Sequence, residues 1–131
     1  MTETPPRILA SSAVLLVRDV ERAANYYRDA MGFTWPRFWG DPPSFVILQR
    51  DNHYLMLKGV ERPEDARPIH RVADVVWDIY FWVSDADALH EEFVRRGAEI
   101  RYAPCDMDYG CREFAVGDLD GYCIGFGQAL D

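Results

Sequence analysis

Long apolar runs are missing from this sequence of 131 residues. No stretch approaches the roughly 18 apolar residues that a membrane-spanning helix needs, so we expect no membrane span. Residues 1–7 also lack the apolar core of a signal peptide, and we expect them to form a flexible tail. The cytoplasm is therefore the default location. GxSxG, P-loop and Rossmann motifs are absent, which removes the most direct sequence evidence for common hydrolase, nucleotide and dinucleotide sites.

Cysteine is scarce and its spacing fits no zinc motif. The chain has three cysteines: Cys105, Cys111 and Cys123. They form no CxxC pair, and an odd number in a region of strands and loops does not suggest a disulfide framework. We interpret them as reduced thiols.

Positive charge is in deficit. The formal net charge is −8, and the second half of the chain, residues 67–131, carries 13 acidic residues against 6 basic ones. A nucleic-acid partner would require a basic face, so we expect none. A cationic or neutral ligand fits this balance better, although acidic surfaces also serve solubility alone.

The sequence does contain an internal repeat. Asp19 and Asp85 each open an amphipathic stretch, and the turns at residues 51–52 and 118–121 each precede a short apolar run. The offsets are 66 and 69 residues. Two near-equal offsets indicate one unit used twice, and each unit reads as strand, helix and three strands. Because the chain is short for two independent domains, we expect the halves to share one core.

The units are predicted at residues 8–59 and 77–128, joined by a connecting loop at 60–76. In the first unit we expect a strand at 8–17, a helix from Asp19 to Gly32, an aromatic strand at 33–39, and a hairpin of 45–49 with 53–58. In the second we expect a strand at 77–83, a helix capped by Ser84 and ending at Gly97, strands at 99–103, 112–116 and 122–126, and a long loop at 105–111.

Two of the predicted strands, residues 54–57 and 79–83, are apolar or aromatic on both faces. A strand of this kind is covered on both sides. A helix can cover one face, and the other requires a second sheet, a partner chain or a ligand. This pattern predicts a binding cleft.

Residues 17–33, followed by Arg112-Glu113-Phe114 and by Asp118-Leu119-Asp120-Gly121-Tyr122, resemble the glyoxalase, bleomycin-resistance and extradiol-dioxygenase superfamily, also called vicinal oxygen chelate proteins. The similarity runs from about Ile8 to Gln128. It implies an α+β fold in which two βαβββ modules form a cupped mixed β-sheet, with the helices outside and the cleft inside the cup. In this superfamily the cleft is often built across two chains, so the resemblance also implies a homodimer.

Metal enzymes of the superfamily place one ligand on the first strand and one on the last strand of each module, usually histidine or glutamate. The matching positions here are Ser12, Met56, Asp78 and Gly125. Of these, Asp78 alone is a suitable ligand, and one carboxylate cannot hold a dedicated metal ion. The histidines His53, His70 and His90 fall on separate elements and are not expected to converge. We therefore expect no metal and no other cofactor, which disfavours glyoxalase I, extradiol dioxygenase and thiol-transferring fosfomycin-resistance activities.

The remaining positions of the cup predict an aromatic ligand site. The predicted ligand-binding residues are Trp35, Phe38, Trp39, Tyr54, Asp78, Tyr80, Trp82 and Gly125. Strand alternation places Val14 and Leu16 on the same side, with Leu15 and Leu55 beneath the helices. Aromatic faces beside one carboxylate suit a planar or cationic molecule. The alternative is that these aromatic residues fill a dimer interface or the core, and that Asp78 is a structural carboxylate.

The leading hypothesis is a cytoplasmic homodimer that sequesters a small aromatic or cationic molecule without a metal, as bleomycin-resistance proteins do. One alternative is a small lyase or isomerase in which Asp78 works with Tyr80, Glu113 or Cys123. Another is a ligand-free dimerising module whose cup is filled by its own side chains, with Trp82 buried. The identity of the ligand, and whether the cleft lies within one chain or across two, stay open at this point.

Overall fold

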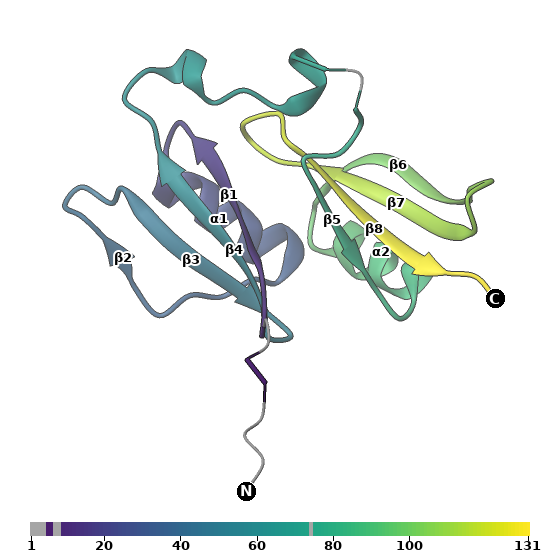
Figure 1. Cartoon of the computed structure of the whole chain (residues 1–131). Helices are drawn as coiled ribbons and strands as arrows, with labels where there is room; N and C mark the ends of the chain where they lie inside the picture. Colours follow the sequence, from purple (N-terminus) through teal and green to yellow (C-terminus); the bar gives the residue numbers. More distant parts are fainter. Residues whose placement is uncertain (1–4, 7–8, 74) are drawn as a thin grey trace, which may run out of the picture.

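The computed structural model describes residues 5–6, 9–73 and 75–131 (Figure 1), so most of the predicted tail lies outside the described residues. The first unit consists of β1 (Ser12–Val17), α1 (Val20–Met31), β2 (Phe38–Trp39), β3 (Phe45–Arg50) and β4 (His53–Gly59). The second consists of β5 (Ile79–Trp82), α2 (Ala86–Arg95), β6 (Glu99–Asp106), β7 (Cys111–Gly117) and β8 (Cys123–Ala129). The predicted α+β fold of two βαβββ units is confirmed.

Each unit forms a mixed sheet of four strands with the same topology. The strand orders are β1-β4-β3-β2 and β5-β8-β7-β6. The outer strand β1 runs parallel to β4, as β5 does to β8, and the other pairings are antiparallel. Figure 1 shows α1 and α2 behind their sheets, so that the other face of each sheet is turned toward the viewer. We call these faces the open face of the first sheet and the open face of the second sheet.

The helices begin at equivalent aspartates. Asp19 accepts a hydrogen bond from the Arg22 amide at 3.0 Å, and Asp85 accepts one from the Ala88 amide at 3.0 Å. The prediction that Ser84 caps the second helix is therefore wrong by one residue. An aspartate side chain at this position satisfies amides that the first helical turn leaves unpaired. Asp85 is equivalent to Asp19 in the internal repeat. The capping-box pattern that begins at Ser84 led to the wrong prediction.

Two predicted strand boundaries also differ from the structure. The aromatic strand expected at 33–39 is reduced to β2 and an isolated bridge between Thr34 and Gln49. The long loop expected at 105–111 is a short turn, because β6 continues to Asp106 before β7 begins. Register shifts between Ile100 and Cys105 allow β6 to stay paired beyond the predicted strand end. The hairpin at Asp51 and Asn52 is as predicted, with φ of 52° and 65°.

Buried residues of the two units, including Met31, Leu48, Phe93 and Phe114, pack together in one cluster. The Arg50 guanidinium also donates to both carboxylate oxygens of Glu92 on α2, at 2.7 and 3.0 Å. No helix in the described part of the chain is long and apolar enough to cross a membrane.

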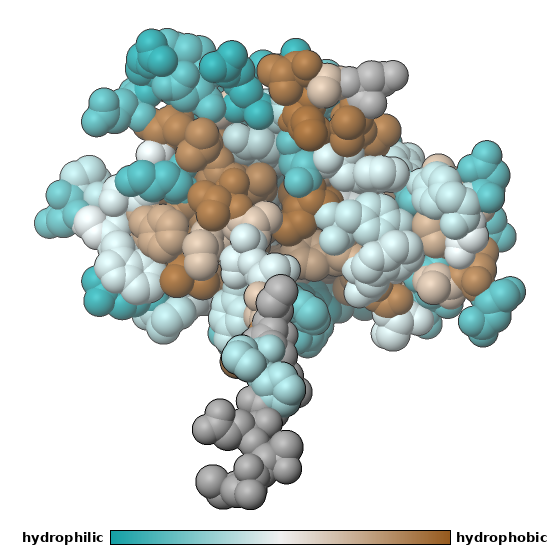
Figure 2. All heavy atoms as spheres, viewed as in Figure 1, coloured by the Kyte–Doolittle hydropathy of each residue, from teal (hydrophilic) through white to brown (hydrophobic). Residues whose placement is uncertain are grey.

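Alternation along the strands is as predicted. On β1, Leu15 is 6% exposed whereas Val14 and Leu16 are 54% and 40% exposed. On β4, Leu55 and Leu57 are buried, whereas Tyr54 and Met56, which alternate with them, are half-buried. Figure 2 looks onto the open faces and shows apolar side chains gathered over the first sheet. Each sheet thus has a helix-covered face within the core and an open face that no helix of the described residues covers.

Candidate functional site

The open face of the first sheet carries two of the predicted aromatic residues. Trp39 packs against Phe45, with ring centroids 5.7 Å apart, and Tyr54 lies on the neighbouring strand β4. Trp35 and Phe38 lie elsewhere, because both pack against the core. Phe38 pairs with the fully buried Val46, and adjacent strand residues point to opposite faces. The predicted placement of Trp35 and Phe38 on the same wall as Trp39 is therefore corrected.

The open face of the second sheet carries a second aromatic group. The Tyr80 ring lies with its centroid 5.1 Å from that of Trp77 and 5.1 Å from that of Trp82, edge-on to each. Glycines make this arrangement possible. A Cβ atom at Gly125 would stand 2.6 Å from the Trp77 ring, and one at Gly127 would collide with the Tyr80 hydroxyl. Gly125 was predicted to be a ligand-binding residue, but in the single chain Trp77 and Tyr80 fill the space beside it.

Asp78 uses its carboxylate to join two backbone segments. Its Oδ1 accepts from the Ile69 amide at 2.6 Å and its Oδ2 from the Cys123 amide at 2.8 Å. Ile69 begins a short 3₁₀ turn (Ile69–Arg71) in the connection between the units, and Cys123 begins β8. These contacts match the alternative in which Asp78 is a structural carboxylate. A role for Asp78 in ligand binding would require an additional interaction.

The four positions that hold a metal in superfamily enzymes do not fit one here. Ser12 and Met56 offer a hydroxyl and a thioether, Gly125 offers no side chain, and Asp78 is engaged with backbone amides. Nowhere among the residues that the structure describes do three histidine, cysteine, aspartate or glutamate side chains gather in a ligating arrangement. Hard divalent ions require several such donors.

Glu113 is the central polar residue of the second open face, although it was predicted only as a possible acid–base partner of Asp78. It lies on β7, is 0% exposed, and its Oε1 accepts from the Tyr80 hydroxyl at 3.0 Å. Tyr109 also donates to Oε1, and Tyr102 donates to Oε2. The Trp77 indole donates to the Tyr102 hydroxyl at 2.8 Å. We call this set, Trp77, Tyr80, Tyr102, Tyr109 and Glu113, the Glu113 cluster.

The Glu113 cluster holds a charged carboxylate among neutral phenols. Burial alone would raise the pKa of Glu113, but hydrogen bonds from Tyr102, Tyr109 and Tyr80 bring it below its usual value. Burial, together with the bonds to Glu113, raises the pKa of each of these tyrosines far above its usual value. At neutral pH the phenols therefore donate hydrogen bonds to a carboxylate anion. Burial also raises the pKa of the neighbouring Cys111 thiol, which stays protonated.

Alternation along β7 could have located this carboxylate. Phe114 and Val116 face the core, so Glu113 and Ala115 must face the open side. Superfamily metal ligands lie on the first and last strands of each unit, so Glu113, on the third strand of its unit, was not among the predicted ligand-binding residues.

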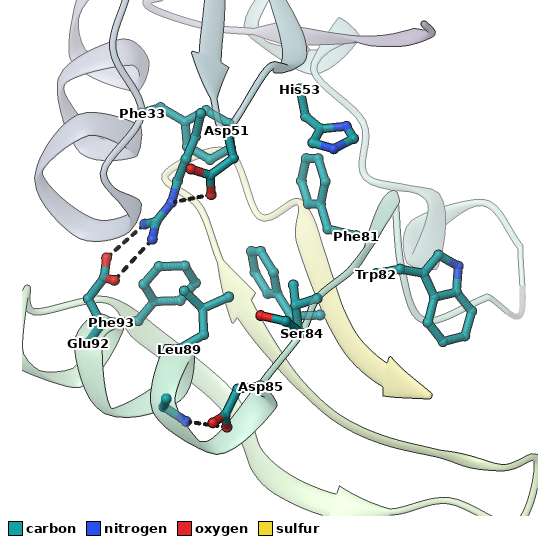
Figure 3. Close-up of a pocket in the computed structure, with 14 residues that line it drawn as sticks. Phe33, Asp51, His53, Phe81, Trp82, Ser84, Asp85, Leu89, Glu92 and Phe93 are labelled. Carbon is teal, nitrogen blue, oxygen red and sulfur yellow. Dashed lines mark hydrogen bonds and ion pairs between the residues drawn. The ribbon is translucent and has the colours of Figure 1, made fainter. Parts of the chain in front are cut away.

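A cavity of about 370 Å³ opens between the two units (Figure 3). Its walls come from the β3–β4 turn, from β5 and from the first turns of α2. Figure 3 shows Phe81 and Trp82 pointing in different directions from β5. Trp82 lines this cavity and also packs against Tyr80. Four of the predicted site residues therefore lie on the open faces as aromatic side chains: Trp39 and Tyr54 on the first sheet, and Tyr80 and Trp82 on the second. Trp82 also lines the cavity.

The family model for the Glyoxalase/Bleomycin resistance protein/Dioxygenase superfamily matches residues 10–126. Among solved structures, the chain is similar to the bleomycin-binding protein from bleomycin-producing Streptomyces verticillus, complexed with copper(II)-bleomycin (26% identity, TM-score 0.69, 97% of this chain and 100% of that one).

Two further structures share the fold at lower identity. They are TioX from Micromonospora sp. ML1 (21%, TM-score 0.73, covering 93% and 99% of the two chains) and TnmS3, an antibiotic binding protein from Streptomyces sp. CB03234 (19%, 0.70, covering 96% and 99%). None of the curated proteins matches this chain.

Proposed function

Because this chain belongs to the Glyoxalase/Bleomycin resistance protein/Dioxygenase superfamily, we propose that it sequesters a small aromatic or cationic molecule, without a metal, against the aromatic residues of its open faces. The observation that carries this proposal is the aromatic group on the second sheet. Trp82 is 68% exposed there, beside Tyr80 and at the edge of the cavity. Large exposed aromatic side chains on one face are typical of a ligand or partner surface.

The comparison with the Streptomyces verticillus protein supports a small-molecule ligand. That protein is described as bleomycin-binding, and the similarity extends over nearly the whole of both chains. This similarity supports the class of function, and no individual ligand contact is inferred from it. The ligand-free alternative expected Trp82 to be buried by the chain's own side chains, and its 68% exposure in the single chain favours a binding role instead.

We place the protein in the cytoplasm as a homodimer. The three cysteines form no disulfide, which is compatible with a reducing compartment. β1 and β5 are both edge strands, and Val14, Leu16 and Trp82 on them are exposed. A second copy would cover these apolar side chains and the unpaired strand edges. Sedimentation equilibrium at micromolar concentration is expected to give twice the chain mass of 15.1 kDa; a mass of 15.1 kDa across the range would contradict the dimer.

The ligand proposal is tested by calorimetric titration of chelator-treated protein with metal-free bleomycin and with flat aromatic cations. Saturable binding is expected without added metal. Replacing Trp82 by alanine should weaken binding of the best ligand by more than about 1 kcal/mol, or about fivefold in Kd, because an exposed indole provides the stacking surface.

Val94→Ala is the matched control, since Val94 is a 52% exposed apolar residue on the outer side of α2. It should leave the affinity unchanged. An unchanged affinity in Trp82→Ala would remove Trp82 from the site. Binding that appears only after a divalent metal is restored would overturn the metal-free proposal.

A further inference from the structure

Glu113 is a buried charge with no cationic partner in the described chain. Its side chain is 0% exposed, and the ion pairs of the described residues do not include it. Burying a carboxylate costs free energy unless an opposite charge or several hydrogen bonds offset it. Here neutral phenols supply the hydrogen bonds and leave the negative charge unmatched. This arrangement is electrostatically complementary to a ligand that brings a positive charge.

The hydrogen bonds at the two carboxylate oxygens are unequal. Oε1 receives donors from Tyr80, Tyr109 and the Cys111 thiol, the last at 3.4 Å, whereas Oε2 receives Tyr102 alone. A carboxylate oxygen has about two lone pairs to offer. The three donors at Oε1 therefore exceed its two lone pairs by one. Oε2, with one donor, keeps one lone pair that can accept a further hydrogen bond.

Tyr109 is the donor that can be replaced. It lies in the short turn between β6 and β7, and it is 54% exposed although its hydroxyl reaches Glu113. Tyr80 is held between Trp77 and Trp82, and Tyr102 is fixed by the Trp77 indole. A ligand entering from the open face would meet Tyr109 first, and displacing it would expose Oε1 without disturbing the other rings.

We infer that Glu113 anchors an organic cation with N–H donors, such as a primary ammonium or amidinium group, which replaces the Tyr109 hydroxyl and lies against the Tyr80 and Trp82 rings. This inference rests on the proposed ligand-binding function and specifies the ligand class for the second open face. The ring faces contribute cation–π attraction and the carboxylate contributes charge-assisted hydrogen bonds. Asp78 is not the anchor in this proposal, because its carboxylate joins the Ile69 and Cys123 backbone amides.

Three matched probes test the inference: 2-naphthylmethylammonium, its N,N,N-trimethyl derivative, and 2-naphthalenemethanol. Calorimetry at pH 7 with wild-type protein should show the primary ammonium binding at least about tenfold more tightly than the neutral alcohol. The trimethyl cation should fall between them, since it keeps the charge and loses the N–H donors. The alcohol measures the aromatic contribution alone.

Three variants distinguish the contribution of the Glu113 carboxylate to ligand affinity from the contributions of neighbouring groups. In Glu113→Gln the preference for the ammonium over the alcohol should fall to about one. Tyr109→Phe removes the competing donor from an exposed turn, so ammonium affinity should rise about two- to tenfold while alcohol affinity stays constant. Asp108→Asn is the control for general electrostatics, because Asp108 is an exposed acid on the same turn, and it should keep the preference.

Equal affinity of wild-type protein for the ammonium and the alcohol would overturn the inference and leave the sequestering function intact. So would a preference that persists in folded Glu113→Gln, or Tyr109→Phe weakening the ammonium. The Tyr109 variant keeps the test decisive if Glu113→Gln fails to fold. Absence of binding for all three probes also overturns the inference, whereas the proposed function is judged separately by the bleomycin titration.

Discussion

Truncating Phe114 to alanine is expected to lower the free energy of unfolding by about 3–5 kcal/mol. The side chain is fully buried in the shared core. Its ring stacks on Phe126 at a centroid distance of 5.1 Å and meets Phe93 of α2 edge-on at 5.8 Å. Because a domain of this size is stable by about 5–15 kcal/mol, such a loss would remove a large share of the total.

The measurement is urea denaturation followed by circular dichroism at one fixed protein concentration, since dimerisation would add to the apparent stability. Phe114→Leu, which keeps most of the apolar volume, should cost clearly less than the alanine variant. Trp82→Ala removes an aromatic ring that is 68% exposed and should change stability by no more than about 0.5 kcal/mol. A loss below about 1 kcal/mol for Phe114→Ala would show that the ring layer contributes little.

This ring layer also supports the candidate site. Phe81, Phe126 and Phe114 stack across β5, β8 and β7 on the core side of the second sheet. Their chain neighbours on the opposite face include Tyr80 and Glu113. Because the strand backbones are shared, packing beneath the sheet fixes the positions of the residues that a ligand would meet. The core and the binding face are two sides of the same three strands.

The repeat and the strand alternation made most of the fold predictable from the sequence. The Asp19 cap of α1 and the alternating burial on β1 and β4 follow from local pattern alone, whereas the cap of α2 was predicted one residue early, at Ser84. The prediction that Phe38 and Trp39 lie on the same aromatic wall was wrong, and the reason is also local. Neighbouring residues in a strand cannot share a face, so one of the two had to point into the core.

The Glu113 cluster was less accessible to sequence reasoning. Its carboxylate comes from β7, while its donors come from β5, from β6 and from the turn between β6 and β7. The position of Tyr102 depends on register shifts within the β6–β7 pairing, which no local pattern specifies. The contacts of Asp78 likewise depend on a 3₁₀ turn in the connection between the units. Both features arise from pairing distant segments.

Asp118 is expected to make the protein more stable as the pH falls from about 7 to about 4.5. Asp118 is 5% exposed and accepts from the Tyr27 hydroxyl at 2.9 Å and from the Asp120 and Tyr122 amides at 2.9 and 2.8 Å. Burial outweighs these bonds and raises the pKa of its carboxyl to about 6, from an ordinary value of 3.8. The folded state therefore binds a proton more tightly than the unfolded state.

The direction of the change in stability with pH follows from this difference in proton affinity between the folded and unfolded states. Stabilisation by protonated Asp118 is fully present below the unfolded-state pKa and is lost as the pH rises through about 6. The amplitude is on the order of 2 kcal/mol, from a pKa difference of about two units. Glu92 acts in a separate window: hydrogen bonds from Arg50 lower its pKa to about 2, so its contribution is lost only at lower pH.

Two substitutions distinguish the charge of Asp118 from its hydrogen bonds. Asp118→Asn keeps an oxygen that can accept from the two turn amides and removes the titrating group. It should match or exceed wild-type stability at pH 7.5 and abolish the rise between pH 7 and 4.5. Asp118→Ala removes the acceptors and should lose about 2–4 kcal/mol throughout this range. Urea titrations at several pH values give both curves, and a rise that persists unchanged in Asp118→Asn would assign the proton uptake to another group.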